Sequence, residues 1–183
     1  MPRLPYKTDA SAGPEEIVAA IRERRGGSLL NLDRQLLYSP ALAVAWNRMM
    51  GTVRTGLAVP PRLREIAICA VATVNGAPYE FHHHAPELLA AGGSEAQVEA
   101  LGDVDAAATR TDLFDRRELA ALRLAVEMTR SVRVGDAVFD EARAALADDS
   151  ILVELVATIA AYNMVSRVIV ALGIEPEQAS AKP

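Results

Sequence analysis

Three consecutive histidines stand close to a glutamate in the middle of the chain, in the run Glu80-Phe81-His82-His83-His84. Glu80 and His84 are four residues apart, so on a helix they share a face and can touch. A carboxylate beside an imidazole orients the ring and favours its charged form, which suits acid–base chemistry near neutral pH. The alternative is a surface salt bridge, which is the commoner outcome for such a pair taken by itself.

A second group of chemical interest lies in the preceding segment. Glu65 stands early in an apolar run, on a face shared with Ile68, Cys69 and Ala72. Its carboxylate is therefore either half-buried against a partner or exposed at the start of a helix. Cys69 is the sole cysteine, and we expect it in the core. A single cysteine excludes an internal disulfide and a two-thiol redox cycle.

Other site chemistries have little support in the sequence. Glu80 and His83 form one E-x-x-H pattern, whereas carboxylate-bridged di-metal bundles use two such motifs and further glutamates. We therefore expect no metal and no cofactor. The chain also lacks the glycine-rich phosphate loops and the serine-nucleophile motif, so nucleotide binding and serine-hydrolase chemistry are not predicted.

The composition predicts one globular, all-α domain over residues 1–183, with an N-terminal arm at 1–13 and a polar tail at 175–183. The 183 residues are 51% hydrophobic and only 4% aromatic, and alanine is abundant, which favours helices over strands. The net charge of −5 argues against a nucleic-acid partner. The N-terminus has no apolar signal segment, so we expect a cytoplasmic protein.

The helices that position the candidate site residues are predicted from the spacing of apolar residues and from capping residues. These signals predict seven or eight helices, at about residues 14–25, 40–56, 62–74, 78–91, 94–101, 115–130, 134–146 and 150–173. Residues 29–38 and 102–114 are expected as connections. Pro86 lies inside the helix of Glu80 and His84, so a kink or break is expected near Ala85.

The last predicted helix is apolar over almost its whole length, from residue 151 to 173. It contains Glu154, Asn163 and Arg167, and at least one of the two charges would sit inside the hydrocarbon of a membrane at high cost. We therefore expect a helix buried in the core or in a subunit interface, not a membrane span.

A family resemblance rests on two runs and their spacing: Leu57-x-x-Pro60-x-x-Leu63-x-Glu65-x-x-Ile68 and Asn75-Gly76-x-x-Tyr79-Glu80-Phe81-x-x-His84. Together they resemble the carboxymuconolactone decarboxylase family, whose fold is also called AhpD-like. The core motif covers about residues 57–101, and looser similarity covers most of 28–175. The resemblance implies an all-α AhpD-like fold and a homo-oligomer, commonly a trimer or a hexamer.

The peroxidase branch of that family works with a glutamate, a CxxC pair and a histidine. Counted from Glu65, the two cysteine positions fall on Ala77 and Glu80, and the histidine falls on His84. The missing thiols disfavour a thiol peroxidase, and the chain looks like the cysteine-free branch. The resemblance then implies His84 as general acid/base, Glu80 orienting it, and Glu65 as a second proton carrier or a group that polarises the substrate.

The member that gives this family its name removes CO2 from a carboxylated unsaturated lactone without a cofactor. The resemblance therefore implies a carboxy-lyase or isomerase acting on a small anionic unsaturated lactone or carbonyl compound. We expect Tyr79, His83, Trp46 and Asn163 to line the substrate site, and His83 stays open as the working imidazole. Two alternatives remain: a peroxide reductase that uses Cys69 with an external thiol, and a non-catalytic oligomeric binding protein.

Overall fold

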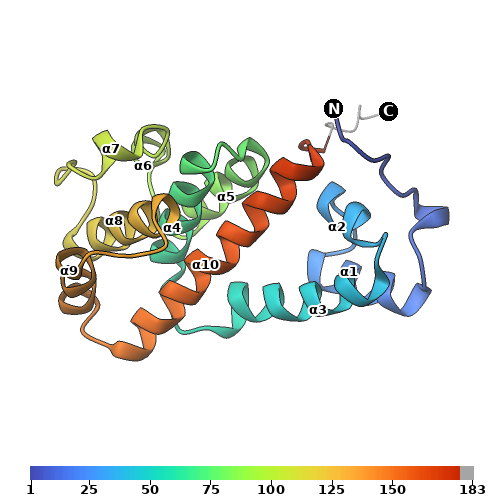
Figure 1. The fold of residues 1–183 in the computed structure, drawn as a ribbon, viewed down its shortest axis with the longest axis horizontal. Helices are drawn as coiled ribbons and strands as arrows, with labels where there is room; N and C mark the ends of the chain where they lie inside the picture. The colour runs from blue at the N-terminus through green and yellow to red at the C-terminus, as the bar shows by residue number, and fades with distance from the viewer. Residues whose placement is uncertain (178–183) are drawn as a thin grey trace. The chain divides into compact units, whose positions relative to one another are not determined.

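The computed structural model describes residues 1–177, and within them it contains ten α-helices and no strand (Figure 1). The all-helical prediction is confirmed, but the predicted number of seven or eight helices is too small. Two short helices, α2 (Asn31–Leu36) and α7 (Val104–Ala107), form where connections were expected. Each is too short to show a helical period in the sequence, so the pattern of apolar residues missed both.

The chain packs as two compact units. The first comprises residues 1–56 and 169–177, with α1 (Glu15–Arg25), α2 and α3 (Pro40–Gly51), a 3-10 turn (Asp9–Ser11) and a π turn (Thr52–Gly56). The second comprises residues 57–168, with α4 (Pro61–Val74), α5 (Pro78–Ala90), α6 (Glu95–Ala100), α7, α8 (Arg116–Arg130) and α9 (Asp136–Leu146). The long helix α10 (Asp149–Leu172) begins in the second unit and ends in the first. That all of it forms one domain stays a prediction.

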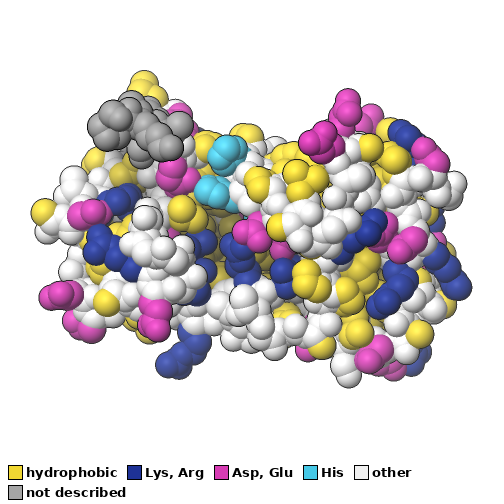
Figure 2. Space-filling model, turned by 180° about the vertical axis from the view of Figure 1, so that it is seen from behind, with side chains coloured by type: hydrophobic (Ala, Val, Ile, Leu, Met, Phe, Trp, Pro, Cys, Tyr) yellow, Lys and Arg dark blue, Asp and Glu magenta, His cyan; other side chains and the backbone are white. Residues whose placement is uncertain are grey.

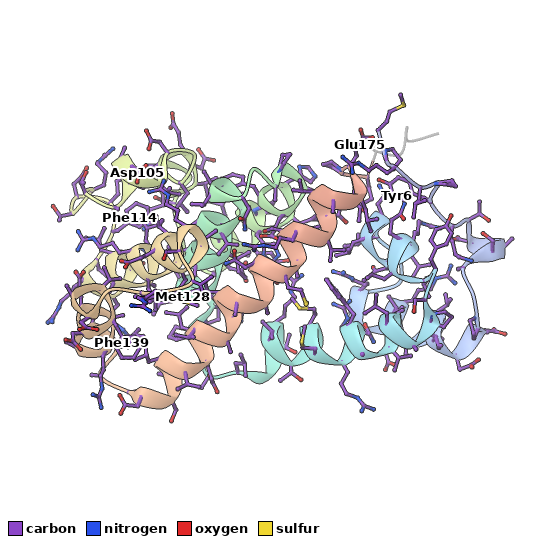
Figure 3. The ribbon with its side chains drawn as sticks, in the orientation of Figure 1. Tyr6, Asp105, Phe114, Met128, Phe139 and Glu175 are labelled. Carbon is purple, nitrogen blue, oxygen red and sulfur yellow. The ribbon has the colours of Figure 1, made fainter. Side chains whose placement is uncertain are left out.

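The first unit is tied together by polar contacts between distant parts of the chain. The buried carboxylate of Asp33 accepts two hydrogen bonds from Arg25, both of 3.0 Å, and a third from the backbone N–H of Leu30. The backbone N–H of Glu175 donates to the hydroxyl of Tyr6 over 3.0 Å (Figure 3). The N-terminal arm is therefore fastened to the segment that follows α10.

Helix α4 is the central element of the second unit. Pro60 and Pro61 begin it, as suits the first turn of a helix, where the missing N–H costs nothing. From Glu65 to Ala72 every residue is buried, because α5 and α8 both pack against α4 (Figure 1). A polar side chain on this stretch is therefore forced to find its partners inside the protein.

The sequence predicts a kink or a break near Ala85, and helix α5 runs without a break from Pro78 to Ala90. Pro86 lacks the N–H that would bond the carbonyl of His82. Both residues are exposed, so water can solvate that carbonyl in place of the missing bond. The helix can therefore carry its proline while keeping Glu80 and His84 on one continuous element.

Two of the predicted helices begin with a capping box. Ser94 accepts a hydrogen bond from the backbone of Gln97 at the start of α6, and Asp115 accepts one from Glu118 at the start of α8. Phe114, which precedes the N-cap residue Asp115, is almost fully buried. The boundaries of α6 and α8 therefore follow from local sequence signals.

Helix α10 is the one helix in residues 1–177 that is long and apolar enough to cross a membrane by length and composition. Its Glu154 carboxylate accepts from the backbone N–H groups of Ala58 and Val59, at 2.6 and 3.1 Å. Its Asn163 amide donates to Thr129 on α8 over 3.0 Å. Contacts of this kind belong to a helix packed within a protein, in line with the expectation of no membrane span, which stays a prediction.

Candidate active site

Helices α4 and α5 bring Glu65 and His84 into direct contact. Asn75 and Gly76 reverse the chain between the two helices, and Gly76 has a φ of 60°, which a glycine adopts without strain. The Nδ1 atom of His84 lies 2.6 Å from Oε2 of Glu65. His84 is 5% exposed and Glu65 is 1% exposed, so this short hydrogen bond is shielded from water.

The second oxygen of Glu65 is also engaged, because Nε of Arg64 donates to Oε1 over 2.9 Å. Burial raises the pKa of Glu65, but the hydrogen bonds and charges of His84 and Arg64 together lower that pKa below its ordinary value. Glu65 is therefore ionised at neutral pH. Since an ionised carboxylate only accepts, the hydrogen of the short bond lies on Nδ1 of His84.

Helix α10 adds Tyr162 to this pair. The ring of Tyr162 meets that of His84 edge to face, with 4.9 Å between the ring centres. Tyr162 is 2% exposed. The imidazole is thus held on one side by Glu65 and on another by an aromatic ring, which fixes its orientation.

Glu80 is buried in a different environment. Its Oε1 accepts from the hydroxyl of Ser166 on α10 over 2.8 Å, and its Oε2 has no hydrogen-bond partner within residues 1–177. Burial raises the pKa of Glu80 to about 8, although the Ser166 bond lowers it somewhat. Glu80 is therefore a neutral carboxylic acid at pH 7.

The structure thus corrects the expected partner of His84. The helical spacing predicts that Glu80 orients the imidazole, whereas the short hydrogen bond comes from Glu65 on another helix. Glu80 directs its bond to Ser166 instead. The spacing placed Glu80 and His84 on neighbouring positions of α5, but the packing of α4 and α10 against α5 decides what each side chain bonds.

The other two histidines lie nearer to solvent. His82 is exposed and His83 is partly exposed, and Figure 2 shows histidine side chains at the surface of the face it draws. The ring of His83 packs against buried Tyr79, with 4.5 Å between the ring centres. Of the three imidazoles, His84 is the buried one, and it carries the short bond to a carboxylate.

Asn163 ties helices together through its side-chain amide. Its oxygen accepts from Asn75 over 3.2 Å and from Arg167 over 2.8 Å, while its nitrogen donates to Thr129 over 3.0 Å. Both the oxygen and the nitrogen of the Asn163 amide are therefore engaged in hydrogen bonds. They join α10 to α8 and to the end of α4, which is a structural task, and a contact of Asn163 with substrate stays a prediction.

Trp46 is 5% exposed and belongs to the first unit. There it lines a small hollow together with Ile21, Leu36 and Asn47. Its assignment to the substrate site of Glu65 and His84 stays a prediction.

Cys69 has no exposed surface. Burial raises the pKa of its thiol far above the ordinary value, and the nearby charges of Glu65 and Glu80 raise it further. The thiolate, which is the reactive form, is therefore suppressed at this position. Within residues 1–177, no three His, Cys, Asp or Glu side chains gather closely enough to hold a metal ion.

Sequence reasoning missed Arg64, Tyr162 and Ser166 as neighbours of the candidate residues. Tyr162 and Ser166 are four residues apart on a largely apolar helix, and polar groups on the inner face of such a helix must find buried partners. That spacing was the available signal. Arg64 had no comparable one, because adjacent residues on a helix do not normally face each other.

Comparison with known proteins finds a family model that is similar to the middle part of the chain. Residues 40–115 match the model of the carboxymuconolactone decarboxylase family. The matched region contains Glu65, Glu80 and His84 and stops before α10, which supplies Tyr162 and Ser166. None of the curated proteins matches the chain.

Solved structures with the same fold cover almost the whole chain. A peroxidase-related protein of Silicibacter sp. TM1040 is 20% identical, with a TM-score of 0.79 over 96% of this chain and 94% of its own. An AhpD-core peroxidase-related protein of Ralstonia eutropha JMP134 is 18% identical, with a TM-score of 0.78 over 97% and 93%. The debrominase Bmp8 is 19% identical, with a TM-score of 0.78 over 94% and 90%.

At these identities the neighbours show the fold and leave the reaction open. Their names cover peroxidase-related proteins and a debrominase, so one fold supports more than one chemistry. The family match covers residues 40–115, fewer than half of the 183 residues, and the solved structures share an AhpD-like fold with almost the whole chain.

Proposed function

We propose that this protein is a cofactor-free carboxy-lyase or isomerase that acts on a small anionic unsaturated lactone or carbonyl compound. The observation that carries the proposal is the buried 2.6 Å hydrogen bond between Glu65 and His84. An imidazole held by an ionised carboxylate in a dry environment is an acid–base group suited to neutral pH.

The pair defines the working atom of the imidazole. Glu65 holds the hydrogen of Nδ1, so Nε2 is the nitrogen that exchanges a proton with a substrate. Glu65 stabilises the positive charge when Nε2 is protonated, as the carboxylate of a catalytic triad does. His84 is therefore the proposed catalytic residue, and Glu65 is the proposed positioning residue.

In a decarboxylation the bond between the substrate carboxylate and its carbon breaks, and CO2 leaves. The electron pair of that bond moves into the conjugated carbonyl and forms a dienolate. His84 then delivers its Nε2 proton to carbon, and solvent restores the proton to the imidazole. In an isomerisation the same nitrogen removes a proton from one carbon and returns it to another, so one group serves both reactions.

Glu80 supplies a second proton close to the pair. At neutral pH it is protonated, and its Oε2 lacks a partner within residues 1–177. A neutral carboxylic acid can donate a hydrogen bond to the carbonyl oxygen on which negative charge develops. We assign Glu80 to this role, in place of the orienting role that the sequence suggested.

A thiol peroxidase is disfavoured. Ala77 and Glu80 occupy the two cysteine positions of the peroxidase branch, and the single cysteine is buried with a raised pKa. Peroxide reduction needs an accessible thiolate. The peroxidase-related names of the structural neighbours therefore do not transfer to this chain.

The test is a substrate panel of carboxylated unsaturated lactones and β-keto acids, with CO2 release and lactone absorbance as readouts. We expect wild-type turnover of at least one compound and a loss of about 100-fold or more in His84→Gln. His82→Gln is the matched control, because it removes an exposed imidazole from the same helix. His83→Gln tests the alternative imidazole. Full turnover by His84→Gln would overturn the assignment.

We further propose that the protein forms a homo-oligomer through α10. Val153 on this helix is 66% exposed and Val170 is 47% exposed, although the helix is apolar over most of its length. Exposed apolar side chains on a long helix favour contact with a second subunit. Light scattering coupled to size exclusion measures the mass directly, and a monomer at micromolar concentration would contradict the proposal.

A further inference from the structure

Arg64 is the positive charge next to the Glu65–His84 pair, and its guanidinium is only partly used. Its side chain is 14% exposed. Nε donates to Oε1 of Glu65, and this is the one side-chain hydrogen bond of Arg64 within residues 1–177. A guanidinium carries five N–H donors, so the two terminal nitrogens of Arg64 are left to bond solvent or a ligand.

Other arginines of this chain show how a guanidinium is satisfied by an internal carboxylate. Arg25 uses two nitrogens on the two oxygens of Asp33, and Arg130 does the same with Asp105. Such paired bonds are the favoured geometry between arginine and a carboxylate. Arg64 departs from it, because the second oxygen of Glu65 is taken by His84.

The combined charge of Arg64, Glu65 and His84 favours a negatively charged ligand. Arg64 and Glu65 cancel, so the group is neutral while His84 is neutral. When His84 takes up its second proton, the group gains a net charge of +1 in a poorly hydrated environment. A buried net charge is costly unless it is paired, and an incoming carboxylate would pair it.

We propose that the terminal nitrogens of Arg64 bind a carboxylate of the substrate and so select acids over uncharged analogues. The proposal rests on the function proposed above, since it supplies the anion site that such a substrate requires. Arg64 and His84 contact the two oxygens of one carboxylate, so a ligand held by Arg64 lies close to the imidazole. Arg64 is thereby the specificity-determining residue of the site.

The test is calorimetric binding of 2-furoate, a small unsaturated acid, and of its methyl ester. We expect furoate to bind the wild type at least tenfold more tightly than it binds Arg64→Gln. Arg64→Lys keeps the charge but loses the planar fork, so its affinity for furoate lies between the two. The ester binds all three proteins equally, because it has no charge for Arg64 to pair.

Arg130→Gln is the matched control, since it removes an exposed arginine of the same unit and changes the net charge by the same amount. Furoate binding must survive in this control. The proposal is overturned if the wild type does not bind furoate, if Arg64→Gln binds it as tightly as the wild type, or if acid and ester lose affinity equally.

The assay requires no turnover, so its result is separate from that of the substrate panel. The wild type could bind furoate through Arg64 and yet convert no compound of the substrate panel. That result would support the anion site and contradict the proposed reaction. If circular dichroism shows that Arg64→Gln does not fold, Arg64→Lys decides, and an affinity equal to that of the wild type would refute the role of the guanidinium fork.

Discussion

Two glutamates of the second unit are buried to the same degree and end up in opposite charge states. Glu65 on α4 is 1% exposed and Glu80 on α5 is 2% exposed. Glu65 bonds an imidazole and a guanidinium, whereas Glu80 bonds one serine hydroxyl. The pKa of Glu65 lies below its ordinary value, and that of Glu80 rises to about 8.

Burial does not set the charge of either carboxylate by itself. Burial is the largest effect on both groups, and it raises both pKa values. At Glu65 the effects of His84 and Arg64 together exceed it. No cation contributes to the pKa shift of Glu80. Burial therefore dominates that shift, and the carboxyl group stays protonated at neutral pH.

The two regions therefore respond to pH in opposite directions. A lowered pKa in the folded state gives stability that is present above the ordinary value of 4.5 and is lost as the pH falls further. A raised pKa gives stability that is present below 4.5 and is lost as the pH rises through about 8. The free energy of unfolding at acid pH therefore reports on Glu65, and that at alkaline pH reports on Glu80.

Glu65→Gln should have the largest effect on both stability and turnover. It leaves Arg64 without its counter-charge and His84 without its ionised hydrogen-bond acceptor, so we expect a loss of about 3 kcal/mol in the free energy of unfolding. Turnover should fall by about 100-fold or more, because His84 loses the group that orients it. Urea unfolding and panel kinetics measure the two effects. A variant with near-normal stability and turnover would show that the Glu65 contact is incidental.

Glu80→Gln should remove the alkaline loss of stability. The wild type loses stability between pH 4.5 and about 8 as the buried acid ionises, by up to roughly 5 kcal/mol for a shift of this size. The amide cannot ionise, so the variant keeps its stability over that range. Urea unfolding at pH 5, 7 and 9 gives the profile, and parallel profiles of variant and wild type would contradict the neutral state of Glu80.

Ser166→Ala should shift the pH dependence of the Glu80 region with a smaller loss of stability. It removes the hydroxyl that donates to Oε1 of Glu80, which costs about 1 kcal/mol. Since that hydrogen bond lowers the pKa of Glu80, its removal should move the alkaline loss of stability to higher pH. A midpoint that moves to lower pH would show that Ser166 does not stabilise the ionised form.

Cys69→Ala should give the smallest effect. Cys69 is fully buried on α4, where the charges of Glu65 and Glu80 help to raise its pKa, and it is not part of the proposed chemistry. We expect turnover within about twofold of the wild type, and no reaction of the native protein with a thiol reagent until it unfolds. Rapid modification in the native state would reopen the peroxide alternative.

Local signals in the sequence explain much of the fold. The capping residues Ser94 and Asp115 begin α6 and α8 as predicted, because a cap depends on neighbours three residues away. The short helices α2 and α7 were missed for the converse reason, since their one or two turns are stabilised by packing and show no period.

The candidate site was predicted as a set of residues but not as a set of contacts. Glu65, Glu80 and His84 were recognised from their spacing, and all three are buried. The pairing of Glu65 with His84 joins two helices, and the bond from Ser166 to Glu80 joins residues far apart in the chain. Neither follows from helical periodicity, which reports only neighbours on one helix.

The central claim is that Glu65 and His84 act as one unit while Glu80 acts separately. A double-mutant cycle in kcat/KM, on a substrate found in the panel, tests it most directly. We predict that Glu65→Gln adds no further loss to His84→Gln, whereas Glu80→Gln multiplies the loss by its own factor. Independent, multiplying effects of Glu65→Gln and His84→Gln would contradict the account.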